Sequence, residues 1–288
     1  MKKPTTPAGS FSFKWMKKGA TSLFCFFLFA NGSSSLRAVE NLRLPDIRAV
    51  GMGGNGTTES VLSNPSLIAL SRQKSVHIQY FNLYGLKELN RLGGSFQCPN
   101  AFLPVGVDIS SFGYEAYREN SLRVVVGKPL NRQWAMGIAF RYAWLQTVWT
   151  EPSVSCLSAD IGLNCRLVEN LLIGLLIQDL PSFQIGNKSI DYKSFKDFRV
   201  QIGFQWEVIN NLLIVGALGG RDEQKIEGNA GLEYTVWKTF HLRAGLQTAP
   251  LLPSFGIGCD FRRFTLDVAA VYHSVLGIQT GIGLSFSF

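Results

Sequence analysis

A period-two alternation of apolar and polar residues runs from about residue 74 to the end of the chain. Successive side chains of a β-strand point to opposite faces, so this alternation predicts strands with one apolar face and one polar or glycine-rich face. About fourteen such stretches follow one another, and most of the connections between them are two to five residues long. Short connections join antiparallel neighbours, which predicts a series of hairpins. In one stretch the apolar face consists of Trp134, Met136, Ile138, Phe140, Tyr142 and Trp144.

The length of these stretches separates two all-β architectures. Many run for ten to fifteen residues, whereas strands of soluble proteins average about five or six residues. Tilted strands that cross a bilayer need about 9–11 residues. The polar faces carry charge and glycine and the apolar faces are rich in aromatic residues, which is typical of a wet lumen inside a lipid-facing wall. We therefore predict an all-β, transmembrane, antiparallel up-and-down β-barrel of about 14 strands over residues 74–288; a soluble β-sandwich is the alternative.

The first 38 residues have the three parts of a signal peptide. They contain six basic residues and no acidic one, an apolar core at residues 19–30, and small residues at 32–35. The 12-residue core is too short to span a bilayer as a helix, so we expect cleavage between about residues 33 and 38. Met16, which is followed by two lysines, is an alternative start of the chain. An exported barrel of this kind predicts the outer membrane of a Gram-negative bacterium, surrounded by outer-membrane lipid.

Several classes of function find no support in the sequence. Without residues 1–38 the chain has 22 basic and 20 acidic residues, so we expect no nucleic-acid partner. Gly51–Gly56 fits the GxGxxG pattern, but no βαβ unit follows it, so we interpret it as a glycine-rich turn rather than a dinucleotide site. No pair of histidines or cysteines has metal-ligand spacing, and the adjacent His273 and Ser274 would point to opposite faces of a strand. We therefore predict no catalytic residue, no metal and no cofactor; an outer-membrane lipid-modifying enzyme is the least favoured reading.

Four cysteines follow the signal peptide. In an oxidising compartment a disulfide is one interpretation. The favoured interpretation treats them as small apolar side chains on strands. They are Cys98, Cys156, Cys165 and Cys259.

The polar faces of the predicted strands carry a nearly balanced set of charges. A two-residue turn at Arg262-Arg263 places Phe261 opposite Phe264 and Asp260 opposite Thr265. A turn centred on Lys238 likewise places Glu233 opposite Arg243, and cross-strand pairs of opposite charge are favourable. We predict a salt-bridge network that fills a narrow lumen, with an ion-selective ring as the alternative. Its members are Arg123, Arg141, Arg166, Arg199 and Arg243 with Asp108, Asp160, Glu207, Glu233, Asp260 and Asp267.

Two predicted strands are apolar on both faces, Leu171–Ile177 and Leu212–Leu218. Part of the interior is therefore apolar. Two explanations remain open at this point: packing against an N-terminal plug, or a path for a hydrophobic ligand.

The segment Asp46–Gly54, followed by Asn64-Pro65-Ser66, resembles the N-terminal segment of the FadL-like outer-membrane proteins, and in particular the PorV/PorQ branch of Bacteroidetes-type bacteria. Phe112–Glu115, Leu242–Gly245 and the terminal Phe288 are similar to the same branch. The resemblance implies a fourteen-stranded barrel with residues 39–73 tucked into its lumen as a plug. The plug residues would be Arg48, Gly51, Gly53, Gly54, Asn64 and Pro65, and Phe286 with Phe288 would form the signal read by the barrel-assembly machinery.

The resemblance also implies two roles, both non-enzymatic. One is transport of a hydrophobic small molecule across the outer membrane. The other is service to type IX secretion, in which external loops dock secretion-system subunits or exported cargo proteins. The polar stretch 180–196 is the longest connection between predicted strands and is the expected external loop.

Overall fold

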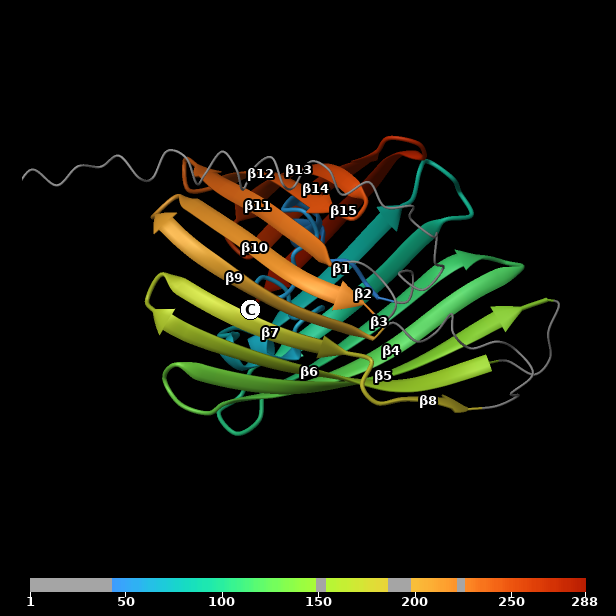
Figure 1. Ribbon diagram of the computed structural model, residues 1–288, viewed down its shortest axis with the longest axis horizontal. Coiled ribbons are helices and arrows are strands. Elements are labelled where there is room, and N and C mark those ends of the chain that lie inside the picture. The colour runs from blue at the N-terminus through green and yellow to red at the C-terminus, as the bar shows by residue number, and fades with distance from the viewer. Residues whose placement is uncertain (1–42, 149–153, 186–197, 222–225) are drawn as a thin grey trace, which may run out of the picture. The chain divides into compact units, whose positions relative to one another are not determined.

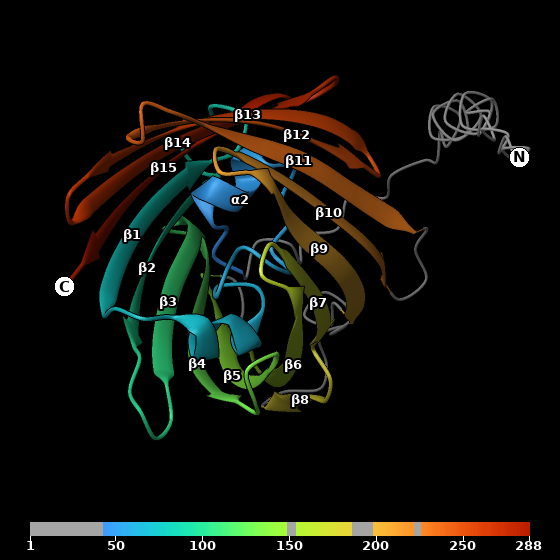
Figure 2. The ribbon, with the colours of Figure 1, turned by 90° about the vertical axis from the view of Figure 1, so that its left-hand side faces the viewer.

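The computed structural model describes residues 43–148, 154–185, 198–221 and 226–288, and the predicted signal peptide lies outside them. Fifteen strands join in one antiparallel sheet that closes on itself (Figures 1 and 2). No helix among these residues has the length and apolar character needed to cross a bilayer. The strands are β1 (Ser75–Asn82), β2 (Asn90–Cys98), β3 (Val105–Tyr114), β4 (Tyr117–Pro129), β5 (Trp134–Thr147), β6 (Val154–Val168), β7 (Leu171–Gln178), β8 (Ser182–Ile185), β9 (Arg199–Ile209), β10 (Leu212–Arg221), β11 (Glu227–Val236), β12 (Phe240–Thr248), β13 (Leu251–Phe261), β14 (Phe264–His273) and β15 (Gly277–Ser287).

Closure of the sheet confirms the predicted barrel. Apart from β8, which pairs with β6, each strand pairs with the wall strands next to it along the chain, and the first strand, β1, pairs with the last, β15. Fourteen strands form the wall, because the short β8 lies on the same edge of β6 as β7 and continues that strand after a break. A closed sheet leaves no unpaired edge, as a strand-built membrane protein requires.

The register agrees with the pairs expected from the turns. Glu233 lies opposite Arg243, and Phe261 lies opposite Phe264. The stretch 180–196 differs from the prediction of a loop. Its first residues form β8, which pairs with β6 from Ser155 to Ser158, and residues 186–196 lie outside the described part of the chain.

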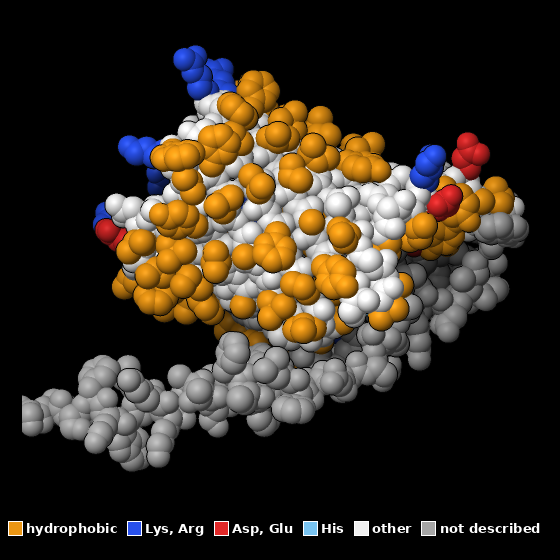
Figure 3. Space-filling view, turned by 90° about the horizontal axis from the view of Figure 1, so that it is seen from above, with side chains coloured by type: hydrophobic (Ala, Val, Ile, Leu, Met, Phe, Trp, Pro, Cys, Tyr) orange, Lys and Arg blue, Asp and Glu red, His pale blue; other side chains and the backbone are white. Residues whose placement is uncertain are grey.

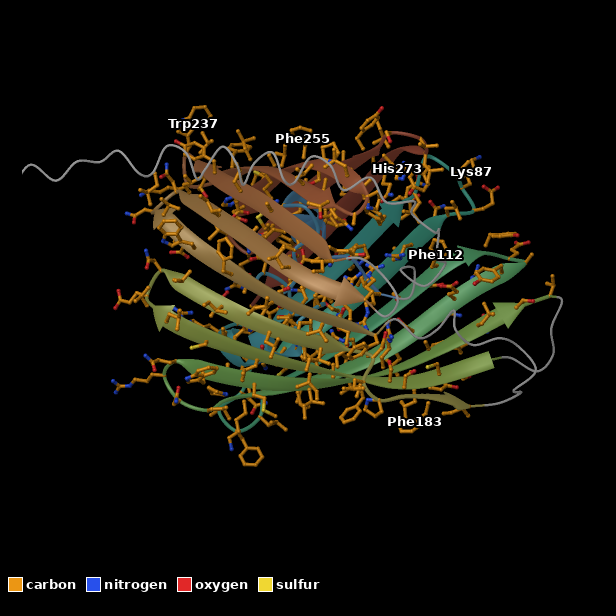
Figure 4. All side chains as sticks on the ribbon, in the orientation of Figure 1. Lys87, Phe112, Phe183, Trp237, Phe255 and His273 are labelled. Carbon is orange, nitrogen blue, oxygen red and sulfur yellow. The ribbon has the colours of Figure 1, made fainter. Side chains whose placement is uncertain are left out.

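The outer face of the barrel is apolar. Large side chains such as Phe140, Ile202 and Phe255 are more than half exposed. Figure 3 shows hydrophobic side chains spread over the middle of the visible face, with Lys, Arg, Asp and Glu at its two ends, and Figure 4 shows Phe255 on the outside. An exposed apolar surface of this extent is far larger than soluble monomers present, and it suits a bilayer.

The inner face encloses the N-terminal segment. Helix α2 (Ile47–Gly51) packs on β12–β15, and the 3₁₀ helix η2 (Pro65–Leu70) packs on β4–β6 (Figure 2). Each begins with a capping side chain: Asp46 accepts from the backbone N–H groups of Arg48 and Ala49, and Asn64 accepts from that of Ser66. The hydrophobic core therefore lies inside the barrel, in three clusters that join this segment to the wall: Ile47 with Phe81 and Ala269, Met52 with Leu213 and Val215, and Ile68 with Val125 and Ala139.

Candidate functional site

The plug, which we define as residues 43–73, lies against glycines of the wall. A Cβ atom at Gly245 would lie 2.1 Å from the backbone nitrogen of Gly53, and one at Gly256 would lie 3.1 Å from the Cα of Gly51. At the η2 end, a Cβ atom at Gly137 would lie 2.3 Å from the carbonyl carbon of Pro65. Only glycine permits such close approach of two backbones. The glycines on the polar faces of the strands thus form the surface that receives the plug.

The plug has its own glycine requirement at one turn. Gly53 and Gly54 follow α2 with φ angles of +83° and +72°, in the left-handed region that glycine adopts without strain. The turn is tied to the wall, because the Ser254 hydroxyl accepts from the backbone N–H of Gly53 at 2.9 Å and the Asn229 amide donates to the Gly53 carbonyl. The GxGxxG stretch is therefore a turn in the lumen, as interpreted from the sequence.

Four charged side chains, which we call the α2 clamp, hold the first helix of the plug. Arg48 on α2 donates from Nε and Nη2 to both oxygens of Glu233 on β11, at 3.0 and 2.8 Å. Arg243 on β12 donates to Glu233 and to Asp267 on β14, both at 2.6 Å. The Arg243–Asp267 pair reaches across β13, where Gly258 leaves room: a Cβ there would lie 2.6 Å from the Arg243 guanidinium. Two cations and two anions balance, so no net charge is buried.

Six side chains, the Arg43 clamp, hold the start of the plug. Arg43 pairs with Asp160 on β6 at 2.9 Å and with Asp179 at 3.0 Å. Arg141 on β5 also pairs with Asp179. The remaining two members are Arg123 on β4 and Asp108 on β3, which pair at 2.8 Å. Arg123 also approaches Asp160 at 3.5 Å. Three arginines again meet three carboxylates.

The break between β7 and β8 supplies one of these carboxylates. Asp179 follows the last residue of β7 with a φ of +58°, is only 2% exposed, and donates its backbone N–H to Asp160. Pro181 lies two positions later, and proline has no N–H for a strand ladder. The wall therefore deviates where the Arg43 clamp forms.

The Asn64-Pro65-Ser66 motif forms a buried hydrogen-bond network at the start of η2. The Asn64 amide donates to the Thr57 carbonyl at 2.7 Å, and its oxygen accepts from the Ser66 hydroxyl at 2.7 Å. Asn164 on β6 donates to the same hydroxyl at 2.6 Å, which joins this hydrogen-bonded group to the wall. Asn64 contacts Gly162, where a Cβ would overlap its oxygen. The motif therefore positions the turn that redirects the plug.

One carboxyl group in the plug lies in an unusual environment. Burial raises the pKa of Glu59 to about 8, and the Thr58 hydroxyl together with Arg48 offsets this only in part. For Arg48, burial lowers the pKa, but the neighbouring Glu233 carboxylate outweighs it and the net direction is upward. Arg48 is therefore permanently charged, while Glu59 is protonated at neutral pH.

The structure brings together some of the predicted lumen charges and separates others. Arg123, Arg141, Asp108 and Asp160 belong to the Arg43 clamp, and Glu233, Arg243 and Asp267 belong to the α2 clamp. Arg166, Glu207 and Asp260 are exposed at strand ends, and Asp260 accepts from Thr265 and contacts His241 instead. Arg199 lies apart from both clamps, 3.9 Å from Glu227. The period-two alternation predicts which face of the strand these residues occupy, but it does not predict how deep in the lumen they lie.

Two members of the clamps were not expected from the sequence. Arg43 precedes the segment that carries the family resemblance, and Asp179 follows the predicted strand Leu171–Ile177 without being one of the predicted lumen charges. The sequence feature that could have identified Asp179 is its position as a carboxylate at the end of an apolar run, two residues before a proline.

Part of the apolar interior packs against the plug. Met52 is fully buried against Leu213 and Val215 of β10, which favours the packing interpretation for that strand. A small cavity of about 10 Å³, room for about one water molecule, lies beside the Arg43 clamp and is lined by Leu44, Leu62, Ile109 and charged groups. Its lining offers apolar carbon atoms next to guanidinium groups.

The remaining predicted features occupy the wall. All four described cysteines are free, and the described residues include no cluster of metal-ligating side chains. At the seam between β15 and β1, the ring of Phe286 lies tilted against that of Phe264 and stacks on that of Phe288, with ring centroids 4.7 and 5.5 Å apart. The Phe288 N–H donates to the Lys74 carbonyl. These rings pack on the last wall hairpin; recognition by an assembly machinery stays a prediction.

Comparison with known proteins gives a fold but no close relative. No protein-family model matches the chain, and no curated protein is similar in sequence. The solved structure of the Pseudomonas putida toluene transporter TodX superimposes with a TM-score of 0.60 at 11% identity, covering 86% of this chain and 99% of that one. A Pseudomonas aeruginosa FadL homologue superimposes with a TM-score of 0.57 at 9% identity, covering 86% and 98%. The chain therefore has the fold of the FadL-type outer-membrane barrels.

Proposed function

We propose that this chain is a non-enzymatic outer-membrane barrel that passes hydrophobic small molecules, with the plug as its closure. The observation that carries the proposal is the way in which the plug is held. It crosses the lumen from β13 and β14 to β4 and β5, and its two charged clamps join it to the wall through side chains rather than through a strand ladder. Desolvation offsets much of the attraction in buried ion pairs, so such a closure can be released.

The comparisons support the class of solute. The matching structures include a toluene transporter and a FadL homologue. Apolar side chains of β10 face the lumen behind Met52. Release of the plug would expose these surfaces to an apolar solute.

Deletion of residues 43–70 tests the proposal. The deletion should give a steady conductance in planar bilayers and faster entry of toluene into vesicles, while the intact barrel stays closed. Because the deletion also removes packing from the wall, Glu233→Gln provides a second variant that keeps the chain length and weakens the α2 clamp. A folded barrel that stays closed in both variants would refute the plug as the closure.

A secretion-linked accessory barrel of the PorV type is the second candidate. The filled lumen favours it, because a barrel that stays closed can serve as a scaffold. Mass spectrometry of the natively extracted protein separates the two. A stoichiometric exported protein or secretion subunit would support the scaffold, whereas a bound apolar molecule without protein would support transport.

A further inference from the structure

Exposed cationic side chains are concentrated at one end of the barrel. Ser75 pairs with Ser287, so the first and last strands of the wall both have their outer ends there. Every turn at this end is described, and its exposed charges comprise eight cations and three carboxylates. Figure 3 shows most of the visible Lys and Arg at this end, on the left. The cations are Arg72, Lys74, Lys128, Arg132, Arg166, Lys238, Arg262 and Arg263, and the carboxylates are Glu169, Glu207 and Asp260.

The opposite end does not share this excess. Among its described residues, the exposed cations are Lys87 and Arg118, and the exposed carboxylates are Glu88 and Glu115. The asymmetry is therefore a property of one rim. We call the eight-cation end the basic rim.

Three of the five described non-glycine residues with a positive φ lie in turns of the basic rim, whereas Tyr84, with a φ of +61°, lies in a turn at the opposite end. Trp237, Lys238 and Arg262 have φ angles of +51°, +61° and +52° in the turns β11–β12 and β13–β14. These left-handed positions favour glycine or asparagine, and a larger residue there lowers the stability of the turn. Residues that adopt an unfavourable backbone conformation without stabilising their own turn are commonly found at functional sites.

Large apolar side chains accompany the cations. Trp237 is 85% exposed next to Lys238, and Phe261 and Phe264 flank the Arg262-Arg263 turn with about half of each ring exposed. Figure 4 shows Trp237 at the edge of the wall, at the end away from Lys87. Exposed aromatic rings beside cations are typical of the headgroup region of a bilayer.

We propose that the basic rim binds the phosphate groups of anionic phospholipids in the periplasmic leaflet. The inference rests on the outer-membrane placement proposed above. The turns at this end are on average the shorter set, and short turns lie on the periplasmic side of outer-membrane barrels. Lipid fits better than an acidic protein because the cations are distributed around the perimeter, from β1 through β4–β7 to β11–β14, next to the apolar wall.

The test measures lipid selectivity of the full barrel in phosphatidylcholine vesicles. Electron paramagnetic resonance of spin-labelled phosphatidylglycerol and phosphatidylcholine gives their relative association with the protein. Each cation that contacts a headgroup should raise the preference for phosphatidylglycerol over phosphatidylcholine about fivefold. Added salt should lower this preference. The variant Lys238→Asn/Arg262→Asn removes two of the eight cations and should lower the preference below that of the wild type. Because asparagine suits the left-handed backbone, the barrel should fold normally.

A matched pair of substitutions controls for net charge. Lys87→Gln/Arg118→Gln removes two cations from the opposite end and should keep the wild-type preference. Equal selectivity in the two double variants, or no selectivity in the wild type, would overturn the proposal. Binding of polyglutamate without lipid selectivity would instead make the rim a protein-docking surface.

Sidedness is tested separately in intact cells. A membrane-impermeant amine reagent should leave Lys238 unlabelled, and labelling of Lys238 in a folded barrel would refute the periplasmic placement. Neither readout depends on conductance, so a failure of the transport proposal would be seen in the plug deletion alone.

Discussion

The close contact between Gly245 and the plug leads to a sharp prediction. In Gly245→Ala the new methyl group would lie 2.1 Å from the nitrogen of Gly53 and 2.2 Å from the carbonyl carbon of Met52. Both atoms belong to the plug backbone, so no change of side-chain rotamer relieves the overlap. The plug must move away from β12.

The overlap should weaken the docking of the plug without destabilising the wall. Overpacking by one methyl group in a well-packed interior costs about 1–3 kcal/mol. Replacing glycine with alanine in a strand stabilises the fold by about 0.4–1 kcal/mol where the backbone allows it. The undocked population should therefore rise roughly 5- to 150-fold, while the barrel itself stays folded.

Planar-bilayer conductance measures this population. Gly245→Ala should open more often than the wild type, and a protease should cut within residues 43–73 faster. Gly220→Ala is the control, because a Cβ atom there meets nothing within 4 Å. If the two variants have equal opening frequencies and equal protease resistance, the glycines do not seat the plug and the reasoning is wrong.

Three further predictions follow from the buried charges and the cysteines. Asp160→Asn leaves the arginines of the Arg43 clamp short of a carboxylate and should destabilise the folded protein by about 3–5 kcal/mol in urea unfolding, whereas the exposed Glu207→Gln should have almost no effect. The folded pKa of Glu59, about 8, lies above its value in the unfolded chain, so the folded state holds the extra proton and docking should weaken as pH rises from about 5 to 8; Glu59→Gln should remove that pH dependence of protease sensitivity. Denatured protein from which the signal peptide has been cleaved should react with four equivalents of maleimide without prior reduction, because all four described cysteines are free; fewer would indicate a disulfide.

Much of the fold follows from the alternation alone. Period two sets which side chains face the lumen, and short turns set the register, so the sequence alone predicts the Glu233–Arg243 pair that the structure contains. The same reasoning placed Arg166, Glu207 and Asp260 on the inner face, but it grouped them with the buried charges although they lie at strand ends, where water reaches them. The break at Asp179 was also missed, since alternation says nothing about where a ladder is interrupted.

The sequence by itself determined a closed barrel with an apolar exterior, a glycine-rich inner face and a balanced set of inner charges. Only the tertiary structure decided which charges meet. Arg43 and Asp160 are 117 positions apart, and Arg48 and Glu233 are 185 apart. Periodicity fixes the direction of each side chain from its own strand, but distances across the lumen depend on the closure of the sheet and on the path of the plug. The glycines show the same division: the sequence placed them on the inner face, and only the packed plug explains why a Cβ atom has no room there.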